Sequence, residues 1–213
     1  FQPLLGEVHA LEAGPSKDTW RLSGDKEASR AYRRCDNFNT SASCNWLVAL
    51  ADPLPHCMSC RLNCTIPDLS DADNRRYWGA IEIAKRRIVS QLLAVGLPVK
   101  SKVSEDPERG VAFDLLRSPP KGPRVMTGHA SGLITLNVEE ADDAKREKVR
   151  HDMREPYRTL SGHFRHEIGH YYWDRLIAGT VWHEPYRALF GDERADYTAA
   201  LRANYEKGPP PDW

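Results

Sequence analysis

Residues 162–170 read Gly-His-Phe-Arg-His-Glu-Ile-Gly-His and contain the pattern H-E-x-x-H. On a helix, His166 and His170 lie one turn apart on the same face, so both imidazoles can reach one zinc ion. A zinc ion held by two histidines keeps room for a third protein ligand and a water, whose pKa the metal lowers to roughly 7. Glu167 lies beside that water and can take its proton. The motif therefore predicts zinc-dependent hydrolysis with Glu167 as the general base.

The residues around the motif predict that it lies on a long helix. Apolar residues recur at helical spacing on both sides of it, and no proline interrupts it. Pro156 suits the first turn of the helix. We expect this helix over residues 156–177, with His163 outside the metal's own ligands. The alternative is that two ordinary histidines happen to flank a glutamate.

A catalytic zinc site needs a third protein ligand, and residues 191–197 offer one at the start of a helix expected over residues 192–205. Two histidines and one glutamate are a common ligand set of catalytic zinc. Glu193 is preferred to Asp192 because its side chain reaches further, and Asp196 could orient a ligating imidazole. The alternative is that these acids only complement the positive end of a helix.

Five cysteines clustered between residues 35 and 64 indicate a second metal site. Cys57 and Cys60 form a C-x2-C knuckle, and Cys35 and Cys44 supply an upstream pair. Two such pairs, on turns folded against each other, hold a tetrahedral zinc ion through four thiolates. Cys64 could replace one of the four, and the alternative is that the thiols are buried without a metal. A closed four-sulfur site stabilises or binds rather than catalyses, because it has no open coordination position.

The chain is expected to form two domains, a zinc-ribbon-like module over residues 1–66 and a catalytic domain over residues 67–213. Hydrophobic periodicity and turn residues predict an α+β fold in which the second domain combines a small antiparallel sheet with helices. Strand 133–138 precedes the metal helix, where a sheet edge could bind an extended peptide. The expected elements are helices at 71–95 and 139–153 and strands at 111–115, 124–127 and 133–138.

Composition excludes several classes of protein. Lys+Arg and Asp+Glu both number 30, so the formal net charge is zero and no basic excess marks a binder of nucleic acid or of anionic membranes. The basic run Lys85-Arg86-Arg87 is most simply a solvated helix face. No apolar stretch is long enough for a transmembrane helix, and clustered thiols indicate metal ligands in the reducing cytoplasm. The chain begins with Phe1 and lacks a secretory signal, so we expect a trimmed or partial chain.

With these residues in view, the chain resembles a bacterial family of zinc-binding metallopeptidases, in which a cysteine-rich zinc ribbon precedes a small zincin domain. The resemblance implies a zincin-like fold and hydrolysis of peptide bonds, with His166 and His170 as zinc ligands and Glu167 as the base. The segments that resemble the family are 44–48, 66–70, 104–110, 132–137, 163–174 and 191–197.

The chain departs from the family at both ends. Family members begin with further cysteine pairs upstream of the region matching Phe1, and they continue past the region matching Trp213 into another acidic, aromatic helix. The resemblance therefore implies that the ribbon is incomplete at its N-terminus and the zincin-like domain at its C-terminus. It also implies an alternative to Glu193 as the third zinc ligand, a glutamate beyond Trp213.

These features together predict a zinc-dependent peptidase with one catalytic and one structural zinc ion. Its expected partners are a peptide or protein substrate and a protein bound through the cysteine-rich module, with neither nucleic acid nor membrane. The alternative function is a non-catalytic protein-binding module in which both zinc ions are structural.

Overall fold

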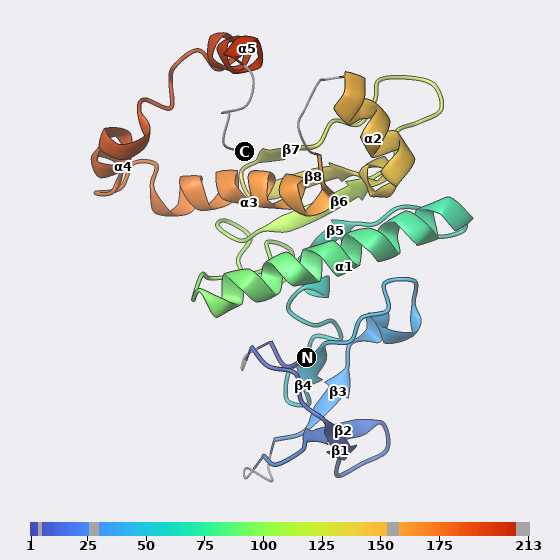
Figure 1. Ribbon diagram of the computed structural model, residues 1–213. Helices are drawn as coiled ribbons and strands as arrows, with labels where there is room; N and C mark the ends of the chain where they lie inside the picture. The colour runs from blue at the N-terminus through green and yellow to red at the C-terminus, as the bar shows by residue number, and fades with distance from the viewer. Residues whose placement is uncertain (4–5, 26–29, 153–157, 208–213) are drawn as a thin grey trace.

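The computed structural model describes residues 1–3, 6–25, 30–152 and 158–207. Figure 1 shows a small β unit below, the long helix α1 (Ala72–Ala94) across the middle, and a second sheet with the remaining helices above. The expected α+β class, with a cysteine-rich N-terminal part, is confirmed. Within the described ranges, no helix is both long and apolar enough to cross a membrane.

The N-terminal unit is an antiparallel sheet with very little core of its own. Among the described residues, its own apolar cluster contains three buried side chains, those of Leu22, Tyr32 and Leu47. A unit with so small a core needs a staple or a neighbour to fold. Its strands, in spatial order, are β1 (Leu11–Ala13), β2 (Thr19–Leu22), β3 (Tyr32–Arg34) and β4 (Leu47–Ala49), and the 3-10 helices η1 (Asp36–Asn39) and η2 (Cys60–Leu62) carry the cysteines.

Helix α1 forms where the sequence predicts it and lies between the two halves of the molecule (Figure 1). The Asp71 side chain caps its first turn by accepting hydrogen bonds from the backbone N–H groups of Asp73 and Asn74. At Gly79 the helix approaches the cysteine-bearing turns so closely that a Cβ would lie 2.6 Å from the Ser41 carbonyl oxygen. The helix therefore packs directly on the N-terminal unit.

The second sheet is mixed rather than antiparallel throughout. Its spatial order is β5-β6-β8-β7, where β5 is Asn63–Thr65, β6 is Ala112–Leu116, β7 is Gly128–Ala130 and β8 is Leu133–Asn137. The expected antiparallel pairing holds for β7 and β8, but β6 runs parallel to both β5 and β8.

The parallel pairing arises from the connection between β6 and β7. Residues 117–127 carry the chain past the position of β8 to the outer edge of the sheet before the hairpin turns back. The strand expected at 124–127 therefore lies at 128–130 instead. In the described sheet β7 and β5 form the two edges, and β8 lies inside.

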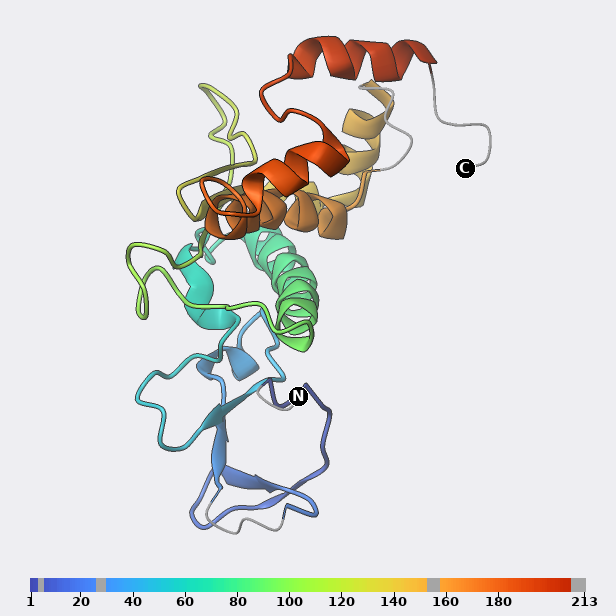
Figure 2. The same cartoon turned by 90° about the vertical axis from the view of Figure 1, so that its left-hand side faces the viewer.

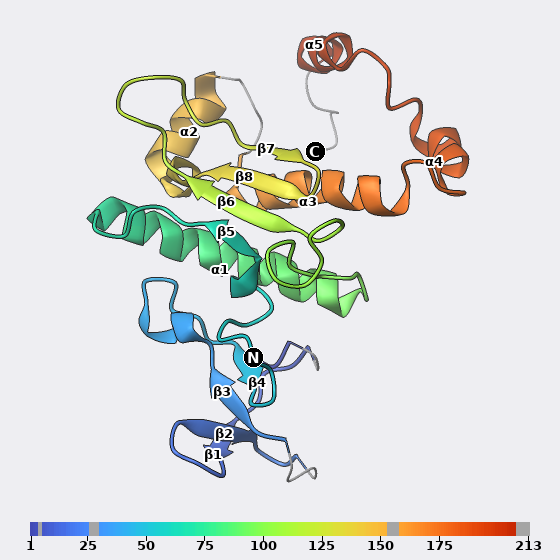
Figure 3. The same cartoon turned by 180° about the vertical axis from the view of Figure 1, so that it is seen from behind.

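Helices α1 and α3 (Leu160–Leu176) cover the same face of this sheet, which lies in front of both in Figure 3. The Thr159 side chain caps α3, while Pro156, expected in its first turn, lies outside the described residues. The charged segment expected as one helix begins instead as the 3-10 helix η3 (Val138–Ala141) and continues as α2 (Asp143–Asp152).

The helix expected over residues 192–205 begins later, as α5 (Tyr197–Lys207), which lies at the top of Figure 2. A further helix that was not predicted from the sequence, α4 (His183–Phe190), precedes it. Gly191 ends α4 with a φ of +87°, so Asp192 and Glu193 lie in a linking segment rather than at a helix start. This corrects the local placement on which the choice of Glu193 depended.

A single buried cluster crosses the expected domain boundary near residue 66. Its members come from the cysteine-bearing turns, from α1, from the second sheet and from α3, and include Cys35, Cys57, Trp46, Trp78, Ile81, Phe113, Leu136, Phe164 and Ile168. The N-terminal unit and the helix of the H-E-x-x-H motif are therefore parts of one core.

Gly132 is a position where the fold requires glycine. Its φ is +82°, and a Cβ there would lie 2.4 Å from the Gly110 carbonyl oxygen. We expect Gly132→Ala to lower the free energy of unfolding by about 2–4 kcal/mol. Gly169→Ala, on α3 with nothing within 4 Å of the new Cβ, should instead raise it by up to about 1 kcal/mol. Urea unfolding followed by circular dichroism measures both, and equal stability of the two variants would contradict this account.

Candidate metal centres

Four cysteines meet in the buried layer beneath α1. The Sγ atoms of Cys35, Cys44, Cys57 and Cys60 all lie within 4.8 Å of one another, and each residue is at most 3% exposed. The Sγ atoms of Cys44 and Cys57 are 3.6 Å apart. Two thiolates bound to one tetrahedral zinc ion at about 2.3 Å are ~3.8 Å apart, so the donor set fits a closed zinc site. The fifth cysteine, Cys64, is exposed and lies outside this group.

The surroundings favour a thiolate in this cluster. Hydrogen bonds from the thiols of Cys44, Cys57 and Cys60 hold the pKa of Cys35 well below its ordinary value, against the opposing effect of burial. The backbone N–H of Cys57 also donates to the Cys35 Sγ atom at 3.3 Å. A deprotonated sulfur is the form that binds zinc.

A buried ion pair on α1 connects the cysteine cluster to the rest of the core. Lys85 Nζ lies 2.7 Å from Glu82 Oε1, and both side chains are 0% exposed. Glu82 Oε2 accepts a hydrogen bond from the Cys60 thiol at 3.8 Å, and Asn63 donates to Glu82 Oε1 at 2.9 Å. Because removing one partner would leave an unpaired buried charge, this network fixes α1 against the cysteines.

Two residues of the basic run on α1 are not on the solvated face that the sequence suggests, whereas the third, Arg87, is exposed as expected. Lys85 and Arg86 are both buried, and Arg86 donates to the Ala42 carbonyl oxygen at 2.9 Å. Their charges are used inside the molecule, because α1 lies against the cysteine-bearing turns. Charge spacing alone could not reveal this, since Asn63 and Ala42, which accept hydrogen bonds from these two side chains, are distant in sequence.

The histidines of the H-E-x-x-H motif face each other on α3. Their Nε2 atoms are 3.1 Å apart, and both residues are exposed. Two imidazole nitrogens at about 2.0–2.1 Å from a tetrahedral zinc ion are ~3.3 Å apart, so His166 and His170 fit one metal. Glu167, between them in sequence, is 8% exposed. The buried side chains of Phe164 and Ile168 anchor the opposite face of this helix in the core.

Glu193 lies near the histidine pair but is engaged elsewhere. It lines a cavity of about 610 Å³ together with His166 and His170. Its Oε1 atom is 3.0 Å from His183 Nε2 and 2.6 Å from Arg187 Nη2. The hydrogen bond from Arg187 lowers the pKa of Glu193 to about 2, so the side chain is a carboxylate at neutral pH.

Among the described residues, no carboxylate joins the two imidazoles in a group of three that could hold one ion. The third ligand therefore stays a prediction. Glu193 would have to exchange the Arg187 guanidinium for the metal, and a glutamate beyond Trp213 remains the alternative.

His129 is a neighbour of the site that sequence reasoning missed. Its ring lies parallel to that of His170 with centroids 6.2 Å apart, and its Nδ1 atom is 3.9 Å from Asp174 Oδ2. Burial lowers the pKa of His129, and its Nε2 atom accepts the Gly132 backbone N–H. His129 reaches the site because strand β7 lies beside α3, and no local sequence pattern predicts that neighbourhood. His163 lies 3.4 Å from Glu140, away from the pair as expected.

The four-cysteine site can be tested against the fifth cysteine. Cys60→Ser removes one of the four buried sulfurs and should lower both the zinc content and the melting temperature, by about 5 °C or more, because zinc binding is linked to folding. Cys64→Ser changes an exposed thiol outside the group and should alter neither. Elemental analysis and thermal unfolding measure both quantities, and equal zinc loss in the two variants would refute the assignment.

Comparison with known proteins finds two zinc-related families along the chain. Residues 74–213 match the model of a family described as "Putative zinc-binding metallo-peptidase", and residues 1–71 match a zinc-ribbon domain. Uncharacterized proteins of Mycobacterium bovis and Mycobacterium tuberculosis are 44% identical over 180 residues, which is 84% of this chain and 52% of each relative. The chain thus spans about half the length of the curated relatives it matches. No solved structure matches it.

The match to the metallopeptidase model covers well over half of the chain and includes the histidine pair, and the zinc-ribbon match includes the four buried cysteines. The chain belongs to the zinc-binding metallopeptidase family described by that model and carries a zinc ribbon at its N-terminus.

Proposed function

We propose that this protein is a zinc-dependent peptidase in which His166 and His170 hold a catalytic zinc ion and Glu167 is the general base. The observation that carries the proposal is the 3.1 Å spacing of the two Nε2 atoms on an exposed face of a helix that is anchored in the core. Membership of a zinc-binding metallopeptidase family supports the same chemistry at a coarser level.

The chain's own groups suit the hydrolysis of a peptide bond. Bound zinc would act as a Lewis acid and lower the pKa of its water to about 7. Glu167 would accept a proton from the attacking water and return it to the departing amine. Its 8% exposure keeps the carboxylate largely out of bulk solvent, where a proton would otherwise be lost.

The surroundings of the histidine pair suit a peptide substrate. The adjoining cavity is lined mainly by apolar and aromatic side chains, and such cavities favour the side chain of a substrate residue. Strand β7 pairs only with β8 among the described strands, so its outer edge can add an extended peptide. The cavity residues besides the histidines and Glu193 are Gly169, Tyr172, Trp173, Leu176, Ile177 and Tyr186.

The cysteine-rich module would play a structural part in this enzyme. Its four sulfurs leave no open coordination position, so a zinc ion there would hold the fold and could present a surface to a protein partner. All five cysteines are free thiols, which suits a reducing cytoplasm.

One observation favours a different function, a non-catalytic protein-binding module. The 3.1 Å between the two Nε2 atoms also suits an N–H···N hydrogen bond between metal-free imidazoles, and Glu193 is paired with Arg187. In that case zinc is bound only at the cysteines and no peptide is hydrolysed.

Substitution of the base distinguishes the two functions. Glu167→Gln should reduce the hydrolysis of a quenched-fluorescence peptide library by about 10²-fold or more while zinc remains bound, because only the proton acceptor is lost. Glu147→Gln, on the charged helix α2, should retain full activity. Activity of Glu167→Gln equal to that of the wild-type protein would contradict the peptidase mechanism, and a wild-type protein that cleaves nothing would favour the binding module.

A further inference from the structure

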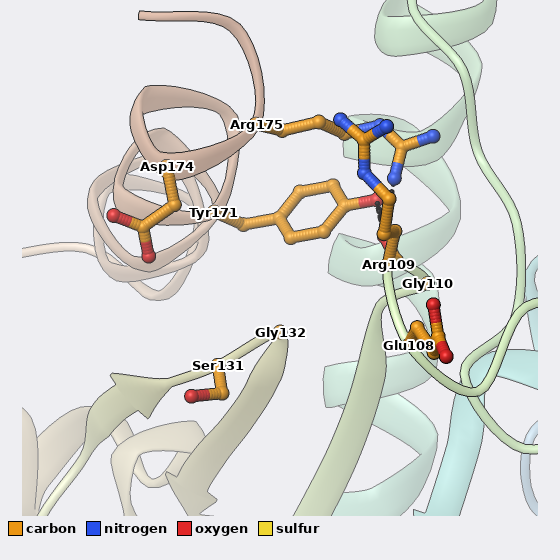
Figure 4. A pocket seen from close by; sticks show the side chains of 8 residues that line it. All are labelled: Glu108, Arg109, Gly110, Ser131, Gly132, Tyr171, Asp174 and Arg175. Carbon is orange, nitrogen blue, oxygen red and sulfur yellow. Dashed lines mark hydrogen bonds between the residues drawn. The ribbon is translucent and has the colours of Figure 1, made fainter. Parts of the chain in front are cut away.

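A second cavity, of about 260 Å³, opens one turn of α3 beyond the histidine pair (Figure 4). It lies between the loop at residues 108–110, the β7–β8 turn at Ser131 and Gly132, and side chains of α3. Neither the histidine pair nor Glu167 lines it. Its walls therefore belong to a separate site that adjoins the proposed catalytic one.

Two arginine side chains make one wall of this cavity positively charged. In Figure 4 the guanidinium groups of Arg109 and Arg175 lie toward the same wall, whereas the Asp174 carboxylate points toward Ser131. Arg175 donates a hydrogen bond to the Arg109 carbonyl oxygen, which also accepts from the Tyr171 hydroxyl at 2.9 Å. Arg175 is thereby fixed in place.

Most of the hydrogen-bonding capacity of these two groups is unused. A guanidinium group has five N–H donors. Arg175 donates one to the Arg109 carbonyl oxygen, and its guanidinium group also lies beside the Tyr171 hydroxyl and ring. The Arg109 guanidinium makes no hydrogen bond or salt bridge to another described residue, although its backbone is held by Asp106 and Tyr171. Like charges on one wall repel each other unless an anion lies between them.

We propose that Arg109 and Arg175 form a subsite for a carboxylate group of the peptide substrate, a proposal that rests on the peptidase function above. A carboxylate is planar and accepts paired hydrogen bonds from guanidinium groups, which suits this wall. Two carboxylates also line the cavity, those of Glu108 and Asp174, but among the described residues neither forms an ion pair with either arginine. The Asp174 carboxylate lies 3.9 Å from the buried ring of His129 instead.

The position of the cavity sets a lower limit on the distance between this carboxylate and the cleaved bond. Arg175 follows His170 by five residues on α3, which is about 7.5 Å along the helix axis and about 140° around it, so the axial rise is a lower limit on their separation. An extended peptide advances about 3.3 Å per residue. Strand β7 leads from His129, stacked on His170, to the cavity at Ser131. The recognised carboxylate therefore belongs to a residue at least two positions from the cleaved bond, either as an acidic side chain or as the free C-terminus.

Binding of matched peptides tests the subsite without relying on turnover. Alanine hexapeptides would carry Glu or Gln at each position in turn, each with a free C-terminal carboxylate or a terminal amide. Their affinity is measured by fluorescence anisotropy on the zinc-loaded Glu167→Gln protein. We expect one acidic form to bind roughly tenfold more tightly than its neutral counterpart. A position-specific preference for Glu identifies a side chain, and a preference for the free acid identifies the terminus.

Variants of the two arginines assign that preference. Arg109→Gln and Arg175→Gln, each added to Glu167→Gln, should abolish it while leaving the affinity for the neutral peptides unchanged. The matched control is Arg165→Gln, on the same helix but bonded to Gln91 and outside the cavity, and it should retain the preference. Arg109→Gln removes only a side chain that makes no hydrogen bond to a described residue, so it keeps the test valid if Arg175→Gln fails to fold.

Equal affinities for acidic and neutral peptides, a preference for acidic peptides that survives both arginine variants, or no measurable binding of any acidic peptide would overturn the subsite. Failure of the peptidase function gives a different result. If the wild-type protein cleaves none of these peptides while the arginine-dependent preference persists, the subsite stands and the catalytic proposal falls.

Discussion

The burial of four cysteine sulfurs against one helix is the constraint on which the rest of this structure depends. Four thiols within 4.8 Å of one another, two of them only 3.6 Å apart, require a cation if they ionise together, and the N-terminal sheet has too few apolar residues to hold them by packing alone. Zinc bound by these four sulfurs would hold the cysteine-bearing turns together where they pack against α1. The same core continues through α1 to the helix of the histidine pair. Loss of the structural metal should therefore disturb the packing at the cysteines and at the histidine pair.

The charges on α1 reinforce this connection. The Glu82–Lys85 pair and the Arg86 guanidinium lie at the contact with the cysteine module, and their partners come from Asn63, Cys60 and Ala42. Buried charges of this kind are tolerated only in one arrangement, so they specify how the helix lies. Helix α3 then packs beside α1 on the same face of the sheet, and its outer face presents the two imidazoles. The zinc ribbon thus supports the proposed catalytic site through packing, without contributing a group to it.

The parts of the molecule governed by local pattern could be predicted from the sequence. Asp71 caps α1 as expected, and the spacing of His166 and His170 requires only a helix to bring their nitrogens together. The parts governed by contacts between distant segments could not. The parallel pairing of β6 with β8, the burial of Lys85 and the stacking of His129 on His170 all depend on tertiary placement. Gly191, a glycine at a helix end, was a local signal for the helix that precedes it, α4, which was not predicted from the sequence.

The proposed hydrolysis depends on a zinc ion bound by the histidine pair. Elemental analysis combined with X-ray absorption at the zinc edge counts the ions in the protein and reports their ligands. The account predicts two zinc ions per chain, one surrounded by four sulfurs and the other by nitrogen and oxygen donors, with the second lost in His166→Ala while the first remains. A single zinc ion with only sulfur ligands in the wild-type protein would contradict it.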